Sequence, residues 1–522
     1  MTRVLRRRDQ NPRCELRHCK KAKGFPNSVP NVRNPFLSTN DLFLSPSQGE
    51  SYAGLLPAAA NTTSLRNSLY FWFFPSSSSS NPLASNELVI WLNGGPGCSS
   101  LEGLIQENGP FLWQSGTYAP QRNPFSWTNL TNVVYVDQPI GTGFSPAAEG
   151  EPGRIVDEER VARDFGVFWR NFVGAFGMQG RKIYLTGESF AGQYIPYIAK
   201  YMLDANDTEH FNLKGILIND PAFNEDDVLF QAPAVAHLNA YANIFNLNAT
   251  FTASVNARAD SCGYTPWLER ALRYPPQGHI PSAPSSSVPG CDVYTDIVNA
   301  ALLVNPCFNV DHLTDFCPYL WDILGFPSLG AGPDDYFARA DVQKAINAPR
   351  TPDWAVCGNP TLGLNFQDHS PPAGLPSGPL GAVIERTGNV VVAHGSLDYL
   401  LLINGTLATI QNLTWHGRQG FHVAPSSWEE FYVPYGRNLA YAIDALTHQS
   451  VPEKSLGLVG GAGVMGRTHS ERGLTFVEVW NSGHELAQYN PAAAFRLLEF
   501  LLGRVERLDV KGGGFSTERE AR

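Results

Sequence analysis

The sequence predicts an α/β protein in which helices cover both faces of a central, mostly parallel sheet. Short apolar runs have the character of strands buried on both faces. Between them lie helical stretches; in residues 159–176, Val161, Phe165, Phe168, Phe172 and Ala175 recur at steps of three and four, on one helix face. Strands that alternate with such helices are typical of a parallel sheet. The strand candidates are SLYFWFF (68–74), ELVIWLN (87–93), NVVYVDQ (132–138), KIYLTGE (182–188), LKGILIN (213–219), NVVVAHG (389–395) and TFVEVWN (475–481).

This alternation stops after residues 213–219 and returns at TGNVVVAHGSLD. The segment between is rich in proline, serine and glycine, and four cysteines lie between positions 262 and 317. We interpret it as a long insertion that forms a cap over the site. The expected organisation is a basic extension (1–45), the first half of the core (46–221), the cap (222–375), the second half of the core (376–505) and a flexible tail (506–522).

Composition limits the function classes. The chain has 522 residues and a net charge of −10; residues 1–24 hold nine Lys/Arg and two acids, or +7, so the remainder carries −10 − 7 = −17. An acidic body argues against nucleic acid as the main partner. The basic start lacks an apolar segment typical of a signal peptide, and we interpret it as a disordered extension or a mis-assigned start; a nucleic-acid role would rest on it alone. With no run of eighteen apolar residues, we expect no membrane span.

The cysteines indicate disulfides rather than a metal site. None forms a C-x-x-C pair or lies beside histidines at zinc spacing, so we expect no metal and no cofactor. Cysteines clustered in a loop-rich segment predict disulfides and an oxidising compartment, secreted or vacuolar. N-x-S/T sequons point the same way. The glycosylation candidates are Asn61, Asn129, Asn206, Asn248, Asn404 and Asn412.

Three candidate catalytic residues follow strand candidates. Ser189 lies in TGESFAGQYIP, between a strand and the start of a helix, while Asp398 ends VAHGSLD and His484 ends VEVWNSGH. The chain order Ser, Asp, His is that of α/β-hydrolases, with the serine on a strand-to-helix elbow. His484 would accept the serine proton as general base, and Asp398 would orient the imidazole. Read singly, Asp398 also fits a turn and His484 a loop histidine.

Six motifs together resemble the serine carboxypeptidase family: WLNGGPGCSS, DQPIGTGFS, GESFAGQYIP, DVQKAINA, HGSLD…NGT and NSGHE…QYNPAAAF. The resemblance runs from about Ser51 to Gly503 and implies the α/β-hydrolase fold, with peptide or protein C-termini as substrates. It implies backbone oxyanion donors at Gly95 and Phe190. The positions that match the family's device for binding the substrate carboxylate are Asn93, Gly94, Glu107 and Glu188. It also implies a bridge from Cys98 to Cys357; Cys262–Cys291 and Cys307–Cys317 are further candidate pairs, although sequence does not fix connectivity.

The glutamates predict acidic working conditions. Two carboxylates beside the substrate's carboxylate would repel it, so they should bind it when protonated. Read alone, Glu107 would be a solvated helix residue. Glu485 stands where the family often has methionine, and a carboxylate there would favour a basic C-terminal residue. LINDPAF replaces a commoner Ile-Gly-Asn where the chain leaves for the cap.

Other interpretations stay open at this point. An acyltransferase would use the same triad and pass the acyl group to an alcohol or amine. A non-catalytic binding protein would use the scaffold alone. We expect a monomer or a homodimer.

Overall fold

A single eleven-stranded sheet organises the protein. The computed structural model describes residues 51–59, 67–77, 86–117, 119–147, 157–325, 335–358, 368–436 and 461–519, with the backbone of Lys20–Lys21. The strand order is β1-β2-β3-β7-β4-β8-β9-β10-β15-β14-β13. The strands are β1 (Lys20–Lys21), β2 (Tyr52–Pro57), β3 (Ser68–Phe74), β4 (Glu87–Leu92), β7 (Asn132–Asp137), β8 (Lys182–Glu188), β9 (Leu213–Asn219), β10 (Val390–Gly395), β13 (Glu429–Val433), β14 (Gly463–Glu471) and β15 (Leu474–Val479).

The centre of the sheet is parallel and both of its sides are antiparallel. Parallel pairs join β7, β4, β8, β9, β10 and β15, whereas β1–β3 and β13–β14 add antiparallel strands. All seven predicted strands are present, which confirms the predicted α/β-hydrolase fold with a mostly parallel sheet. The four strands of this sheet that sequence analysis did not identify, β1, β2, β13 and β14, lie toward its sides. There a polar face and a bulge between Phe431 and Tyr432 weaken the apolar pattern.

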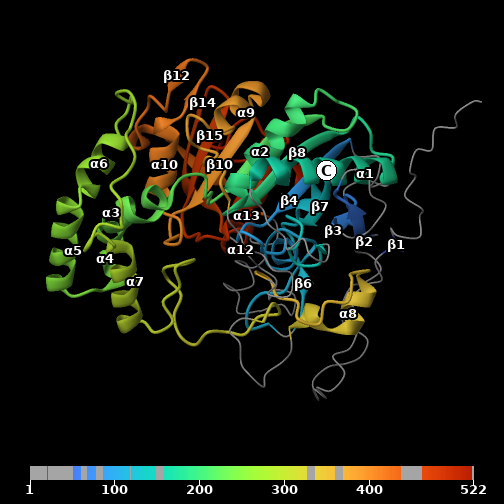
Figure 1. Cartoon of the computed structure of the whole chain (residues 1–522), viewed down its shortest axis with the longest axis horizontal. Coiled ribbons are helices and arrows are strands. Elements are labelled where there is room, and N and C mark those ends of the chain that lie inside the picture. Colours follow the sequence, from blue (N-terminus) through green and yellow to red (C-terminus); the bar gives the residue numbers. More distant parts are fainter. Residues whose placement is uncertain are drawn as a thin grey trace, which may run out of the picture.

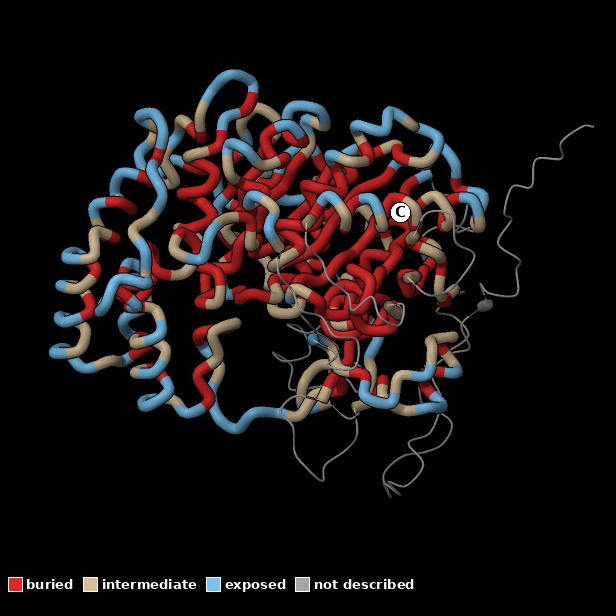
Figure 2. Tube along the Cα trace, in the orientation of Figure 1, coloured by how far each residue is buried: buried red, intermediate tan, exposed pale blue. Residues whose placement is uncertain are grey.

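Helices cover both faces of the sheet (Figure 1), and the strands between them are buried (Figure 2). In β4, Leu88, Ile90 and Leu92 face one apolar cluster, and Val89 and Trp91 face the other. The first face is covered by α1 (Glu158–Phe176), α2 (Ala191–Asp204) and α9 (Leu380–Thr387), and the second by η3 (Gly103–Glu107), α8 (Ala340–Ala345), α12 (Leu486–Tyr489) and α13 (Pro491–Leu501).

Helix α1 shows how local signals fix an element. The Asp157 side chain caps its first turn by accepting the Arg160 N–H at 2.6 Å, and Gly177 ends it with a left-handed φ of 63°. Of the five residues predicted to form its apolar face, Val161, Phe165, Phe168 and Phe172 are buried; Ala175, near the end, is partly exposed.

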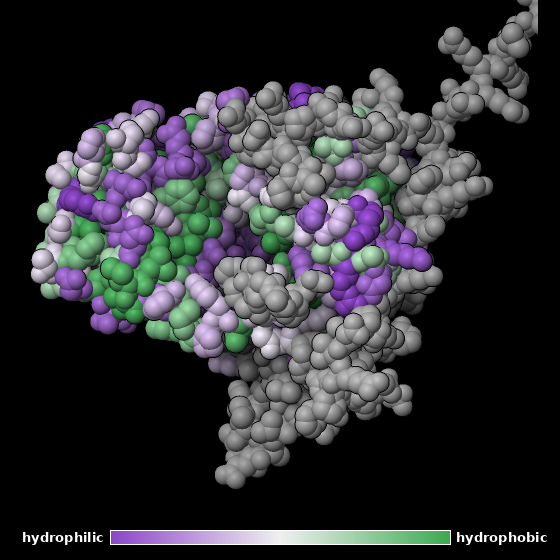
Figure 3. Space-filling view, turned by 60° about the horizontal axis from the view of Figure 1, so that its bottom comes forward, coloured by the Kyte–Doolittle hydropathy of each residue, from purple (hydrophilic) through white to green (hydrophobic). Residues whose placement is uncertain are grey.

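Helices that follow β9 form a third apolar cluster beside the sheet (Figure 1). Figure 3 shows hydrophobic residues gathered on this side of the molecule; Leu302, Leu303 and Val304, at the end of α7 (Val293–Val304), are exposed.

Residues 335–346, which we also assigned to the cap, instead pack Phe337 and Val342 against the second face of the sheet. The cap elements are η5 (Asp227–Gln231), α3 (Ala232–Ala240), α4 (Ala242–Phe245), α5 (Ala249–Ser261), α6 (Tyr264–Ala271) and α7 (Val293–Val304). Helix α10 (Ile403–Asn412) contacts α3 and α6.

Three disulfides tie these parts together. Cys98–Cys357 joins the loop after β4 to a segment 259 positions later in the chain, and Cys262–Cys291 and Cys307–Cys317 close cap loops. These are the three candidate pairs named from the sequence.

The ends of the chain are described in part. The predicted extension 1–45 lies outside the described residues, apart from the backbone of Lys20–Lys21. The C-terminal segment, where we expected a flexible tail, packs Leu508 and Phe515 into the core and ends in α14 (Ser516–Arg519). Among the described helices, none is long and apolar enough to cross a membrane.

Candidate active site

The predicted nucleophile lies on a sharp turn between β8 and α2. Ser189 has a φ of +57°, a left-handed conformation that a non-glycine residue adopts only when its surroundings impose it. Close packing imposes it here: a Cβ on Gly187 would lie 2.1 Å from the Leu92 carbonyl, and one on Gly192 would lie 2.8 Å from Pro221. Ser189 is partly exposed while β8 before it is buried. The strained turn therefore presents the hydroxyl at the carboxyl end of the sheet.

The glycine loop after β4 lies against this elbow. A Cβ on Gly94 would approach the Phe190 nitrogen to 2.4 Å and the Ser189 Cβ to 2.7 Å, so only glycine fits. Gly95 follows with a φ of +109°. The loop thus brings the Gly95 backbone near the Phe190 N–H, at the N-terminus of α2, where the helix favours negative charge. This is the arrangement expected of an oxyanion hole.

Asp398 and His484 form a buried pair. His484 Nδ1 lies 2.9 Å from Asp398 Oδ2, and the N–H groups of Leu400 and Leu401 donate to Asp398 Oδ1. Burial lowers the pKa of His484, but the neighbouring carboxylates, Asp398 foremost, outweigh it and raise the pKa overall. Among the described residues no hydrogen bond joins Ser189 to His484; this bond is often loose in hydrolases without substrate.

One cap loop holds both members of this pair. The loop is closed by Cys307–Cys317, and its Asp311 carbonyl accepts the His484 N–H at 2.7 Å. Leu313 N–H donates to the Leu397 carbonyl, next to Asp398. The cap therefore positions the acid and the base together as well as covering them.

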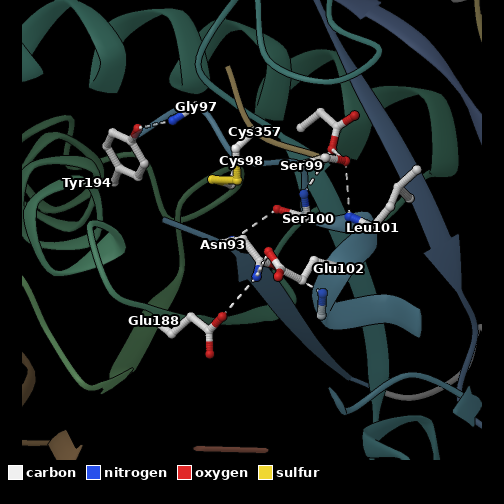
Figure 4. Close-up of a disulfide and its surroundings, with 12 residues drawn as sticks. Asn93, Gly97, Cys98, Ser99, Ser100, Leu101, Glu102, Glu188, Tyr194 and Cys357 are labelled. Carbon is white, nitrogen blue, oxygen red and sulfur yellow. Dashed lines mark hydrogen bonds between the residues drawn. A yellow bond between two sulfur atoms is a disulfide. The ribbon is translucent and has the colours of Figure 1, made fainter. Parts of the chain in front are cut away.

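Three glutamates surround the side chain of Asn93, and we call this set the glutamate cluster: Asn93, Glu102, Glu107 and Glu188. Asn93 Oδ1 accepts from the Trp91 indole and the Gly103 N–H, which turns its Nδ2 toward the carboxyl groups. Nδ2 lies 2.9 Å from Glu188, 3.4 Å from Glu107 and 3.4 Å from Glu102. Figure 4 shows Glu102 and Glu188 approaching the asparagine from different elements.

The basic group that acts on Glu102 and Glu107 is His484, and it lowers their pKa values by less than burial raises them. Burial raises the pKa of Glu107 to about 7 and that of Glu102 to about 8. Burial, and next the Glu107 charge, raises the pKa of Glu188 well above its usual value. Oε2 of Glu107 and Oε2 of Glu188 are buried without a hydrogen-bond partner among the described residues. At acidic pH the cluster is therefore a set of neutral carboxyl groups able to donate hydrogen bonds.

Sequence analysis missed Glu102. Its carboxyl group meets Glu107 because η3 is a π-helical turn, in which the Asn108 N–H bonds the Gly103 carbonyl, five residues earlier. In such a turn residues five apart lie side by side, whereas α-helical spacing would separate them. The glycine within Glu102-Gly103 was the only local hint: a Cβ there would lie 2.0 Å from the Trp91 indole nitrogen.

Glu485 is partly exposed and precedes α12, which packs against η3. Burial and the Asp311 charge raise its pKa well above the usual value. The predicted pocket residue thus lies beside His484 and on the side of the glutamate cluster.

Comparison with known proteins decides the family. Residues 37–265 and 325–504 match the sequence profile described as serine carboxypeptidase. The chain belongs to the serine carboxypeptidase family. The stretch that this match leaves out, 266–324, falls within the cap.

Relatives in this family share most of the chain. A carboxypeptidase Y homolog of Arthroderma benhamiae is 48% identical over 484 residues, covering 92% of this chain and 87% of its own. Serine-type carboxypeptidase F of Aspergillus niger is 44% identical over 471 residues, covering 88% and 85%. The crystal structure of the prohormone-processing carboxypeptidase Kex1 of Saccharomyces cerevisiae covers 90% of this chain and 94% of its own, with a TM-score of 0.63 at 23% identity, a likeness of fold.

The glycosylation candidates differ in their surroundings. Asn206 and Asn248 are exposed, whereas both ends of the Asn412 amide bond the Ile280 backbone. Asn129 donates to the Pro124 carbonyl, Asn404 is partly exposed, and Asn61 lies outside the described residues.

Proposed function

We propose that this serine carboxypeptidase removes C-terminal residues from peptides at acidic pH through an acyl-enzyme on Ser189. One observation carries the proposal: a buried asparagine amide ringed by carboxyl groups lies directly beside the elbow that presents Ser189. A group that must bind a carboxylate within reach of a nucleophile selects peptides by their free C-terminus.

The reaction follows from the positions of these groups. Ser189 Oγ attacks the last peptide carbonyl and gives its proton to the neutral form of His484, while Asp398 holds the imidazole and stabilises its positive charge. The N–H groups of Gly95 and Phe190 stabilise the oxyanion. His484 then returns the proton to the leaving amine, and Ser189 is left acylated. Water, activated by His484, releases the shortened peptide by the reverse proton path.

The glutamate cluster explains the acidic preference. The substrate carboxylate would bind Asn93 Nδ2, the Gly94 N–H and the protonated carboxyl groups of Glu107 and Glu188. When Glu107 ionises, near pH 7, an added negative charge would repel the substrate. Hydrolysis of peptides should therefore weaken as pH rises through about 7, and hydrolysis of esters without a carboxylate should not.

We further propose that the leaving residue is preferably basic. Glu485 directly precedes α12 and follows His484, and Glu102 contributes a second carboxyl group on the same side, with Asp311 nearby on the cap loop. An ammonium or guanidinium group among these carboxyls would hold at least one of them ionised and pair with it. The observation that supports this preference is that these acids repel one another: the Asp311 charge raises the pKa of both Glu102 and Glu485, and His484 is the basic side chain that opposes it.

We propose a secreted or vacuolar protein, in line with its disulfides and its exposed Asn206 and Asn248 sequons.

The test compares N-blocked dipeptides with a free C-terminus and their C-terminal amides, from about pH 4 to about pH 8, with Ser189→Ala as control. We expect loss of one residue, fastest at low pH, slower for the amides and absent in the variant. If dipeptides stay intact while esters pass their acyl group to added alcohols, the protein is an acyltransferase. No turnover of any substrate by folded protein would contradict catalysis itself.

A further inference from the structure

Two more ionisable side chains, Asp220 and His394, lie against Asp398, and neither belongs to the predicted triad. Both are fully buried, as is Asp398. His394 Nε2 lies 3.6 Å from Asp398 Oδ2 and 3.7 Å from Asp220 Oδ1. One oxygen from each carboxyl group and one ring nitrogen all fall within 4.8 Å of one another. With His484 they form what we call the histidine–aspartate cluster: His484, Asp398, Asp220 and His394.

Neighbouring parallel strands bring these residues together. Asn219 ends β9 opposite Ala393 of β10, and the Asp220 N–H donates to the Ala393 carbonyl. Asp220 has a φ of +43°, so the chain turns back and its Oδ1 accepts the Gly395 N–H at 2.7 Å. This is the LINDP segment, which departs from the commoner family pattern.

The hydrogen bonds fix the state of His394. Its Nε2 lies 2.8 Å from the Leu401 carbonyl, which only accepts, so Nε2 carries the proton. Thr406 Oγ1 lies 3.1 Å from Nδ1 and donates to it. Burial lowers the pKa of His394 to about 4, which leaves the ring neutral. Since the hydrogen bond to the Leu401 carbonyl leaves Nε2 with no free lone pair, this group of three is not arranged to hold a metal ion.

The surroundings of Asp220 require a proton on it. Oδ1 is taken by Gly395, while Oδ2 is buried with no partner among the described residues. Asp398 must be ionised to orient His484, and two buried carboxylates at this distance would repel. Burial, and then the Asp398 charge, raises the pKa of Asp220 well above its usual value.

No lysine or arginine is among the groups that shift the pKa of Asp220. The other ionisable groups near the pair are His394 on β10 and Glu107 of η3 and, around Asp398, His484, Asp311 of the cap loop and His237 on α3. Burial lowers the pKa of His237 to about 3, so that ring is neutral too. The positive charge of protonated His484 already pairs with Asp398.

We propose that Asp220 is a positioning residue that carries a proton on Oδ2, directs it toward Asp398, and sets the upper pH limit of the catalytic triad by losing it. This rests on the proposed function, in which His484 is the base. Asp398 already raises the pKa of His484, and when Asp220 ionises a second negative charge raises it further. A smaller fraction of the ring is then the neutral base that accepts the Ser189 proton, and acylation slows.

An ester substrate separates this effect from carboxylate binding. A blocked amino-acid ethyl ester has no carboxylate, so the glutamate cluster does not control its binding. We would measure kcat/KM against pH for the wild type, Asp220→Asn, Asp220→Ala and Glu158→Gln. Glu158 is the matched control, a buried glutamate on α1 whose two oxygens also have no partner.

We expect Asp220→Asn to stay within about threefold of wild type at acidic pH and to move the alkaline limb upward by about one pH unit or more. Asp220→Ala, which loses the donor, should lower kcat about tenfold with little change in KM. Glu158→Gln should leave the limb in place. Asp220→Ser, which donates and cannot ionise, carries the test if Asp220→Asn does not fold.

An alkaline limb that coincides in wild type and Asp220→Asn would overturn the inference, as would equal losses in Asp220→Asn and Asp220→Ala. If Ser189→Ala hydrolyses the ester as fast as wild type, the proposed function fails first, and this inference with it.

Discussion

Two groups of buried acids flank Ser189, and their protons are placed in opposite ways. In the histidine–aspartate cluster, Asp398 receives two backbone N–H groups and the imidazole, and a carboxylate is what its role requires. In the glutamate cluster, a single amide group, Asn93 Nδ2, is shared among three carboxyl groups. The first set of donors favours the charged form, and the second leaves neutral acids.

This difference teaches that burial alone does not assign a role to an acid. Glu188 and Asp398 are buried alike, at 3% and 0% exposure. What separates them is the number of donors and the presence of a cation. The proposed enzyme would need both outcomes at once, an ionised aspartate for the base and protonated glutamates for the substrate carboxylate.

The largest effect is expected when the negative charge of Asp398 is removed from the histidine–aspartate cluster. Asp398→Asn should lower kcat on the order of 10⁴-fold at unchanged KM, because the amide no longer favours the imidazolium and permits the wrong tautomer. Steady-state kinetics with a blocked dipeptide would measure it, and circular dichroism would verify the fold. A loss below about tenfold would remove Asp398 from the account.

The second prediction concerns the glutamate cluster. Glu188→Ala should raise KM for peptides about 100-fold, whereas Glu188→Gln, which keeps an N–H donor, should bind better than Glu188→Ala and lose pH dependence. Ester hydrolysis is the internal control, and it should change little in either variant. If the two variants are equally impaired at every pH, the protonated form is not what binds.

The third prediction is an effect on stability. Glu107 and Glu102 have folded-state pKa values raised from 4.5 to about 7 and about 8. Between these values the folded protein holds more protons than the unfolded chain, so its stability is full below about pH 4.5 and falls as pH rises to about 8. His484, with a raised pKa, acts in the same direction. Two buried histidines act in the opposite direction below about pH 6.5, because burial lowers the pKa of His394 to about 4 and that of His237 to about 3. The lowered pKa of Asp204 acts only at lower pH.

Thermal melting should therefore give a Tm on the order of 5 °C lower near pH 8 than near about pH 6.5, where both buried histidines are neutral in the folded and the unfolded chain. Glu102→Gln and Glu107→Gln should flatten this dependence. A Tm that rises over the same interval would contradict the protonated cluster.

The smallest expected effect concerns specificity. Glu485→Gln should reduce the preference for Lys or Arg over Leu as the leaving residue by about tenfold or less, since one partly exposed carboxylate contributes modestly. Competing substrates that differ only in the last residue would measure it, with Glu430→Gln, an exposed residue of β13, as control. If the preference for Lys or Arg over Leu is the same in Glu485→Gln and Glu430→Gln, Glu485 contributes no selectivity.

Sequence reasoning found what lies at strand ends. Four strands can be recognised in the sequence, and they are followed by the glycine loop, the elbow serine, the aspartate and the histidine. The carboxyl ends of these strands lie along the same edge of the sheet. It missed Glu102 because a π-helical turn changes which residues are neighbours. It missed Asp220 and His394 because their approach depends on the pairing of β9 with β10. The cap follows no periodic pattern, and the family match also omits 266–324.

The most direct test follows kcat/KM for one blocked dipeptide and its matching ester in the same enzyme as pH rises. The account predicts that the ratio of peptide to ester hydrolysis falls through about pH 7, where Glu107 loses its proton, while Ser189→Ala cleaves neither. A ratio that stays constant while both activities change together would show that the glutamates do not bind the substrate carboxylate in protonated form, and would contradict the account.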